Sequence, residues 1–320
     1  MPIIKTLSRA LKQEKERFTI PRSVQDAIPI RRVWPDGIFQ SGSLYSKSFS
    51  FTDINYSIAG KDDKTAMFLD YSELLNALDS GAFAKVTINN RRIDKAEFEK
   101  DLLLPEKGDG LDHFRKEYNE MLLSKVTGVS SSVVQDRYIT VSVVKKNINE
   151  ARAYFSRVGT SIITHLAQLS SVGRELELQD RLRIFRDFFK GGEPAAFDFN
   201  LKENMRLGHS FKDWLCPDSM EFHKDCCRLN GRWGRALYLQ GYASYLKDAM
   251  VSELCDLDRS LMLSIDILPV PTDEAVREVQ NKLLGVETNA ANWQRKQNAA
   301  NNFSAVLPYD MEQQRKETKE

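Results

Sequence analysis

Apolar residues recur at every second position in three separate stretches of the chain. Ala84, Val86 and Ile88 alternate with polar residues, and the same pattern runs through 139–143 and 261–267. Successive side chains of a strand point to opposite faces of its sheet, so this alternation indicates strands with one buried face. We therefore expect three half-buried strands that lie far apart in the sequence.

Apolar residues spaced three or four positions apart predict helices elsewhere in the chain. Asp62 or Asp63 is expected to cap the first helix and Gly81 to end it, while Asn147 caps a longer one. The Gly191-Gly192 pair is expected to stop another. The apolar positions of the expected helices fall within 67–78, 111–122, 151–166, 182–189 and 276–283.

Two glycine-containing dipeptides predict tight turns between strands. Asn230-Gly231 favours a type I′ turn, which would pair a strand over 220–229 with one over 232–240. Ser41-Gly42 predicts a second hairpin, because glycine supplies the positive φ that such a turn requires. Hairpins of this kind make antiparallel rather than parallel sheets.

Hairpins mixed with helices indicate an α+β fold, with mixed or antiparallel sheets and helices packed on one face. We expect two such units, the first over 36–200 and the second over 201–288. An amphipathic arm and proline-punctuated connector would precede them over 1–35. Past Gly285 the composition shifts to Asn, Ala and Gln without an apolar stripe, so 289–320 is expected to be a linker.

Both ends of the chain carry short segments with helical character. Ile3, Leu7 and Leu11 share one face of a basic helix within 3–17, and its narrow apolar stripe favours docking onto protein over contact with lipid. Asp310 begins a helix that reaches the last residue without a stop signal, and so short a helix is marginal alone. We therefore expect the chain to be the front portion of a longer protein.

Charge and composition exclude several classes of protein. The chain has 46 basic and 45 acidic side chains, a net charge of +1, and thus no overall field to attract nucleic acid, although local patches stay possible. No apolar run approaches the roughly 18 residues of a membrane span, and no signal peptide opens the chain. Four cysteines do not make a disulfide framework. These features predict a cytoplasmic protein.

The glycine spacing that comes nearest to a phosphate-binding loop is Gly37-x4-Gly42-Ser43. A phosphate loop needs a lysine for the β- and γ-phosphates, and it connects a strand to a helix. This segment lacks the lysine and lies in a predicted hairpin. We expect no nucleotide hydrolysis and no cofactor site on this chain.

A metal site would have to use histidine and cysteine residues, and a nucleophilic site would need a thiol or hydroxyl beside a base. Structural zinc sites use two close pairs of ligands, whereas His223-x2-Cys226 is the single possible pair here. The neighbours Cys226 and Cys227 would point to opposite faces of a strand, and no G-x-S-x-G elbow is present. We expect no metal site and no catalytic residue. The candidates weighed are His209, Cys216, His223, Cys226, Cys227 and Cys255.

Basic residues cluster at several strand and helix positions. The pairs Arg31-Arg32, Arg91-Arg92 and Lys145-Lys146 are interpreted as solvated strand ends, with contact to a phosphate backbone as the alternative. Farther along, arginines alternate with acidic residues, which indicates an exposed face laced with ion pairs. These residues are Arg174, Glu175, Glu177, Asp180, Arg181, Arg183, Arg186 and Asp187.

Six blocks of sequence resemble the amino-terminal region of the conjugal-transfer ATPases of type IV secretion systems. This is the VirB-type, TraC/TraE-like family, and the resemblance is to its branch on integrative conjugative elements. The similarity covers essentially the whole chain, although none of the blocks is a catalytic motif. The blocks are 3–11 (IIKTLSRAL), 51–56 (FTDINY), 87–92 (TINNRR), 117–122 (EYNEML), 269–275 (PVPTDEA) and 301–306 (NNFSAV).

The resemblance implies a parent protein more than twice as long, whose RecA-like domain binds ATP and magnesium and drives DNA or pilin transfer. It implies that the front portion self-associates and docks onto membrane-embedded channel components, at the inner face of the cell membrane, with no small-molecule substrate. We therefore expect an assembly module of such an ATPase that ends before the phosphate loop. The alternatives are a stand-alone accessory protein that competes for the same channel partners, and an enzyme built around His223 and Cys226.

Overall fold

The computed structural model describes most of the chain between residues 21 and 319. The predicted helix within 3–17 and the Gly191-Gly192 pair lie outside the described residues. The described residues are 21–54, 56, 58–92, 103–128, 133–190, 199–241, 249–257, 259–300, 302 and 307–319.

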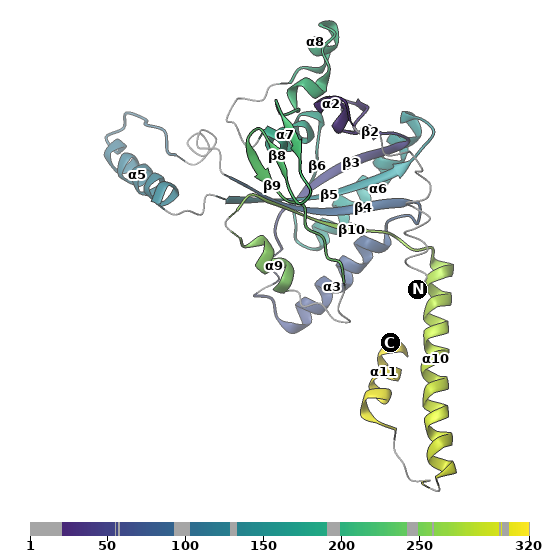
Figure 1. Ribbon diagram of the computed structural model, residues 1–320. Helices are drawn as coiled ribbons and strands as arrows, with labels where there is room; N and C mark the ends of the chain where they lie inside the picture. Colours follow the sequence, from purple (N-terminus) through teal and green to yellow (C-terminus); the bar gives the residue numbers. More distant parts are fainter. Residues whose placement is uncertain are drawn as a thin grey trace.

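A seven-stranded antiparallel sheet forms the centre of the molecule (Figure 1). Its strands run in the order β1-β2-β3-β5-β4-β10, and β6 pairs with β3 beside this path. Together with the helices, this sheet confirms the predicted α+β class. The strands are β1 (Arg32–Val33), β2 (Phe39–Ser41), β3 (Leu44–Phe51), β4 (Ala82–Arg92), β5 (Val133–Val144), β6 (Gly173–Glu175) and β10 (Leu261–Ile267).

Two helices, α3 (Lys61–Asn76) and α6 (Ile148–Gln168), cover one face of this sheet. Asn147 caps α6 as predicted, because its side chain accepts a hydrogen bond from the amide of Glu150 at 2.9 Å. The stripe on α6 then packs on Phe49 and other apolar side chains of β3, β5 and β4. This contact buries the main core.

A second, smaller core lies on the opposite face, between β2 and α7 (Leu178–Lys190). Phe39 of β2 belongs to it, whereas Ile38 and Tyr45 belong to the main core. Helices therefore cover both faces, and the expectation of helices on one face was wrong in this respect. The reason is that side chains of this sheet are buried on both faces: Tyr45 of β3 faces the main core, and Phe39 of β2 faces α7.

The segment predicted as a connector contributes to this second core. It contains α2 (Val24–Ala27) and β1, and Ile28 and Ile30 are both buried. Two further elements close the core, α8 (Leu201–Arg206) and the 3-10 helix η1 (Phe211–Trp214).

Arg181 lies inside the molecule and not on the exposed, ion-paired face that the sequence suggested. Its guanidinium donates hydrogen bonds to the carbonyls of Gly37 (2.8 Å) and Ser46 (2.7 Å), and to the Ser46 hydroxyl (3.1 Å). It also lies 4.0 Å from the centre of the Phe39 ring. Burial lowers the pKa of Arg181 to about 9, which leaves the group charged at neutral pH. The backbone carbonyls of Gly37, just before β2, and of Ser46 in β3 thus take the place of a carboxylate.

A separate three-stranded sheet contains β7 (Met220–Phe222), β8 (Cys227–Leu229) and β9 (Arg232–Gly234). The Asn230-Gly231 turn is confirmed, with positive φ at both residues. The single strand predicted over 220–229 was wrong, because the chain turns between His223 and Cys226, whose backbone groups are joined at 2.9 Å. Cys226 consequently lies in this turn and Cys227 in β8.

β10 belongs to the second predicted unit but pairs with β4 of the first. Seven residues stay in register, from Leu261 opposite Asn90 to Ile267 opposite Ala84. A short helix, α9 (Ala249–Cys255), leads into this strand, and the carbonyl of Cys255 accepts a hydrogen bond from the Asn90 side chain at 2.6 Å. The strands of the second unit are therefore divided between the two sheets.

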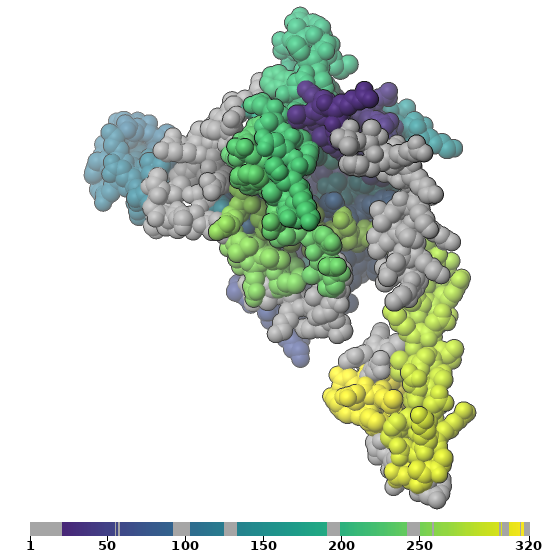
Figure 2. Space-filling view, in the orientation of Figure 1, coloured from purple at the N-terminus to yellow at the C-terminus, as the bar shows by residue number. Residues whose placement is uncertain are grey.

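The stretch predicted as a linker is largely helical. α10 (Thr272–Ala299) continues past Gly285, and α11 (Tyr309–Lys319) follows where Asp310 predicted a helix. A glycine inside a helix costs only about 1 kcal/mol relative to alanine, and the Ala and Gln residues that follow it are good helix formers. Figure 2 shows α10 and α11 extending away from the body of the molecule. Among the described residues, no helix combines the length and apolar character needed to cross a bilayer.

Candidate interaction surface

Helix α5 (Asp112–Gly128) stands apart from the sheet, in the connection between β4 and β5 (Figures 1 and 2). We call residues 103–128, which comprise α5 and the loop before it, the α5 arm. Its sequence was predicted to form a helix with an apolar stripe, and the helix is present.

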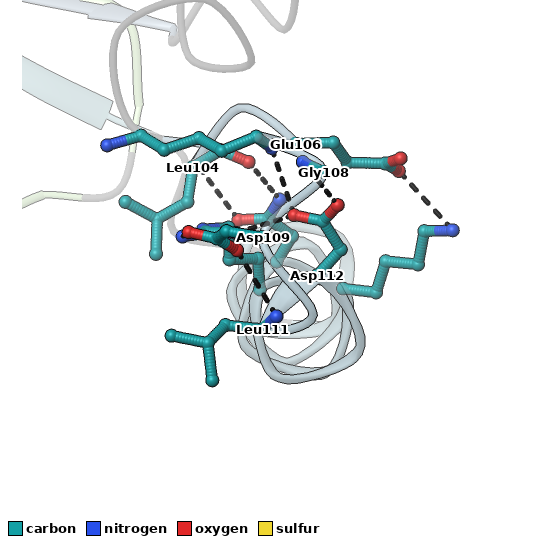
Figure 3. Close-up of polar contacts among 10 residues, drawn as sticks. Leu104, Glu106, Gly108, Asp109, Leu111 and Asp112 are labelled. Atoms are coloured by element: carbon teal, nitrogen blue, oxygen red, sulfur yellow. Dashed lines mark hydrogen bonds and ion pairs between the residues drawn. The ribbon is translucent and has the colours of Figure 1, made fainter.

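The loop before α5 is fastened to the helix by Arg115. The guanidinium contacts both carboxylate oxygens of Asp109, at 2.5 and 2.6 Å, and Asp112 at 2.5 Å. Figure 3 shows Asp109 and Asp112 where the loop meets the start of α5. A planar guanidinium that contacts two carboxylates at once fixes their relative position. Arg115 therefore sets where the loop lies on α5.

Asp112 and Asn119 extend this fastening to the loop backbone. Asp112 accepts hydrogen bonds from the amides of Lys107 (3.0 Å) and Gly108 (2.9 Å). The Asn119 side chain exchanges two bonds of 2.9 Å with the backbone of Leu104. The α5 arm thus holds its shape through its own contacts.

The charges of this cluster stabilise one another. The hydrogen bond from Arg115 lowers the pKa of Asp109 to about 2. The pKa of Asp112 is also lowered, first by the amide of Lys107 and then by Arg115. Both carboxylates therefore stay ionised at neutral and mildly acidic pH.

The apolar stripe of α5 is left uncovered. Its side chains are spaced by three, four and three residues, so they share one face of the helix. Their exposed fractions run from 43% to 58%, although each is a large apolar side chain that solvent does not favour. Exposed apolar side chains that share one helix face make this stripe a candidate interaction surface. The stripe consists of Leu111, Phe114, Tyr118 and Met121.

Arg115→Ala is expected to detach the loop from α5 without unfolding the sheet. The amides of Lys107 and Gly108 should exchange with solvent about tenfold faster or more, because the cluster that positions Asp112 is lost. Hydrogen–deuterium exchange measured on peptides covering 103–111 tests this. Lys116→Ala is the matched control, since Lys116 contacts the exposed Glu106 at 3.4 Å. Equal exchange in both variants would contradict the role of Arg115.

The histidines and cysteines weighed as metal ligands are not gathered at one place. Cys216 and Cys255 are buried in different parts of the fold, and Cys226 and Cys227 are free thiols. His223 packs against Trp233, with ring centres 5.4 Å apart. In the parts of the chain that the structure describes, no three His, Cys, Asp or Glu side chains could share a metal ion.

The remaining sequence candidates lie in several different elements of the fold. Gly42 lies at positive φ in the predicted β2–β3 turn, and Gly37 lies where the backbone approaches Leu176. The predicted ends of α3 were wrong: Gly60 is its N-cap, Asp62 and Asp63 fall in its first turn, and the helix ends before Gly81, at Asn76. Arg91 pairs with Asp136 at 2.6 Å, and His209 lies in the turn between α8 and η1.

No protein-family model matches this chain, and the search of characterised proteins gives no significant match. The resemblance to conjugal-transfer ATPases therefore stays a prediction from the sequence. The apolar spacing predicted the stripe on α5 but not its exposure, since the same spacing occurs on helices that cover the sheet. The clamp by Arg115 was not predicted, although Asp112 and Arg115 are spaced to share one helix face.

Proposed function

We propose that this chain is an assembly and docking module of a conjugative type IV secretion ATPase, and that the α5 arm is its docking surface. The observation that carries the proposal is the uncovered stripe on a helix that stands apart from the sheet. In this proposal the chain carries no catalytic step. ATP and magnesium belong to the RecA-like domain of the parent family.

The expected partner is a membrane-embedded component of the conjugation channel, which would place the chain at the inner face of the membrane. Support comes from the resemblance of the sequence blocks, one of which, 117–122, lies within α5. Covering four half-exposed side chains would contribute on the order of 1 kcal/mol each. The Arg115 cluster keeps the arm ordered before binding, which lowers the entropy cost of association.

Replacing Phe114 and Tyr118 by serine is expected to reduce binding to the channel component at least about tenfold, because the middle of the stripe is lost. The measurement is a titration of the full chain onto the purified channel protein in detergent. The matched control is the Phe68→Ser, Leu69→Ser double variant, which changes two exposed apolar residues of α3.

The two variants separate docking from folding. Both should keep the circular dichroism and thermal unfolding of the native chain, since all four side chains are exposed. Equal binding by the two variants would rule out the α5 arm as the docking surface. An absence of binding by the native chain to any channel component would overturn the proposed function itself.

A further inference from the structure

A cleft of about 280 Å³ lies between the last turns of α7 and the turn that joins α8 to η1. It lies outside the α5 arm, and the proposed function does not use it. Among the described residues it is lined by Arg186, Lys190, His209, Asp213 and Trp214.

A buried asparagine fixes two walls of this cleft. The side-chain amide of Asn204 donates to the carbonyl of His209 at 2.8 Å, and its oxygen accepts from the indole N–H of Trp214 at 3.0 Å. Asn204 is 6% exposed. The ring of Trp214 also packs edge-on against Phe199, 5.9 Å between centres. The aromatic wall is therefore held in place before any ligand arrives.

The other walls carry basic side chains. Arg186 and Lys190 lie four residues apart on α7 and thus on the same face of the helix. The Arg186 guanidinium also donates to the carbonyl of Trp214 at 3.4 Å. Of the described lining residues Asp213 is the single acid, and its carboxylate accepts from the Ser210 amide and the Gln25 side chain.

We propose that this cleft binds one nucleotide unit, with its phosphate between Arg186 and Lys190 and its base on Trp214. Guanidinium and ammonium groups are the usual donors to phosphate, and an aromatic ring is the usual platform for a base. The volume is near the lower end for small-ligand sites, so it suits a single nucleotide better than a dinucleotide cofactor. The unit is either a free mononucleotide or part of a single strand. No hydrolysis is implied.

The test is calorimetric titration of the full chain with thymidine 5′-monophosphate, with inorganic phosphate, and with a 5′-phosphorylated oligothymidylate of about ten nucleotides. Lys190→Glu is expected to weaken binding of the monophosphate about tenfold or more, because it reverses a charge that contacts the phosphate. Lys202→Glu is the matched control, since Lys202 is exposed on α8 and does not line the cleft. It should bind as the native chain does.

Each outcome decides the proposal. Tighter binding of the oligonucleotide supports a single strand as the source, and equal binding supports a free nucleotide. Inorganic phosphate that binds as tightly as the monophosphate would overturn the role of Trp214. Unchanged binding by Lys190→Glu, or no binding of either nucleotide at millimolar concentration, would overturn the site. Unfolding curves of both variants show whether a loss of binding reflects a loss of fold.

Discussion

Gly37→Ala is expected to lower the free energy of unfolding by about 3 kcal/mol or more, as overpacked and strained positions do. A Cβ atom at this position would lie 2.0 Å from the carbonyl oxygen of Leu176. The backbone of Gly37 also has a φ of +74°, which costs an alanine roughly a further 1 kcal/mol. The measurement is urea unfolding followed by circular dichroism.

The clash cannot be relieved by a small movement, because both chain segments are held. The Leu176 amide donates to the carbonyl of Ser48 at 3.0 Å, and the Gly37 amide donates to the carbonyl of Trp34 at 3.0 Å. Gly208→Ala is the control, since Gly208 has a φ of +70° but no atom near its missing Cβ. It should lose only about 1 kcal/mol. Similar losses in the two variants would show that the approach of Leu176 is not the cause.

Gly37 illustrates what the sequence could not reveal about glycines. Its spacing to Gly42 suggested a comparison with phosphate loops, whereas its conformation serves a contact with Leu176, 139 positions later. Gly42, by contrast, acts within its own hairpin, and the sequence predicted it correctly. Neighbouring residues are enough to predict a local turn, but they do not reveal which distant segment of the chain approaches it closely.

The same distinction applies to the strands and helices. The alternation of apolar residues predicted a strand over 261–267, and β10 has these bounds. The alternation did not predict that β10 pairs with β4. The spacing on α6 and on α5 predicted two amphipathic helices equally well. α6 buries its stripe on the sheet and α5 exposes its stripe. The spacing of apolar residues determines which face of a helix is apolar. The topology of the fold determines whether another element covers that face.

The pattern of charged residues in the sequence was the poorest predictor of which side chains are buried. Arg181, Arg183 and Arg186 stand in one charged run, but one is buried against the β2–β3 hairpin and another lines the cleft. The side chain of Arg183 is 45% exposed. The burial of these arginines differs because of their positions on α7: Arg181 lies on the buried face of the helix with Leu178 and Leu182. A helix that packs against carbonyl groups can bury an arginine where apolar spacing alone would predict a leucine.

Arg181→Met is expected to destabilise the fold by about 2–4 kcal/mol, since one buried and two partly buried acceptors lose charged hydrogen-bond donors of roughly 1.5–3 kcal/mol each. These acceptors are the carbonyls of Gly37 and Ser46 and the Ser46 hydroxyl. Recovery of the desolvation energy of a buried cation offsets part of the loss, because methionine is accommodated by the apolar surroundings. Methionine also keeps most of the packing on Phe39, so cavity formation adds little.

The measurement is chemical unfolding of the full chain, with Arg183→Met as the control on the same helix. Arg183 lies 4.0 Å from Asp187 at the surface, and its replacement should change stability by less than about 0.5 kcal/mol. Arg181→Lys should fall between the native chain and Arg181→Met, because an ammonium group keeps the charge but cannot span all three acceptors. If Arg181→Met unfolded at the native urea concentration, the carbonyl contacts would not be what joins α7 to the β2–β3 hairpin. The joint would then rest on the apolar contacts of Leu178 and Leu182 in the second core.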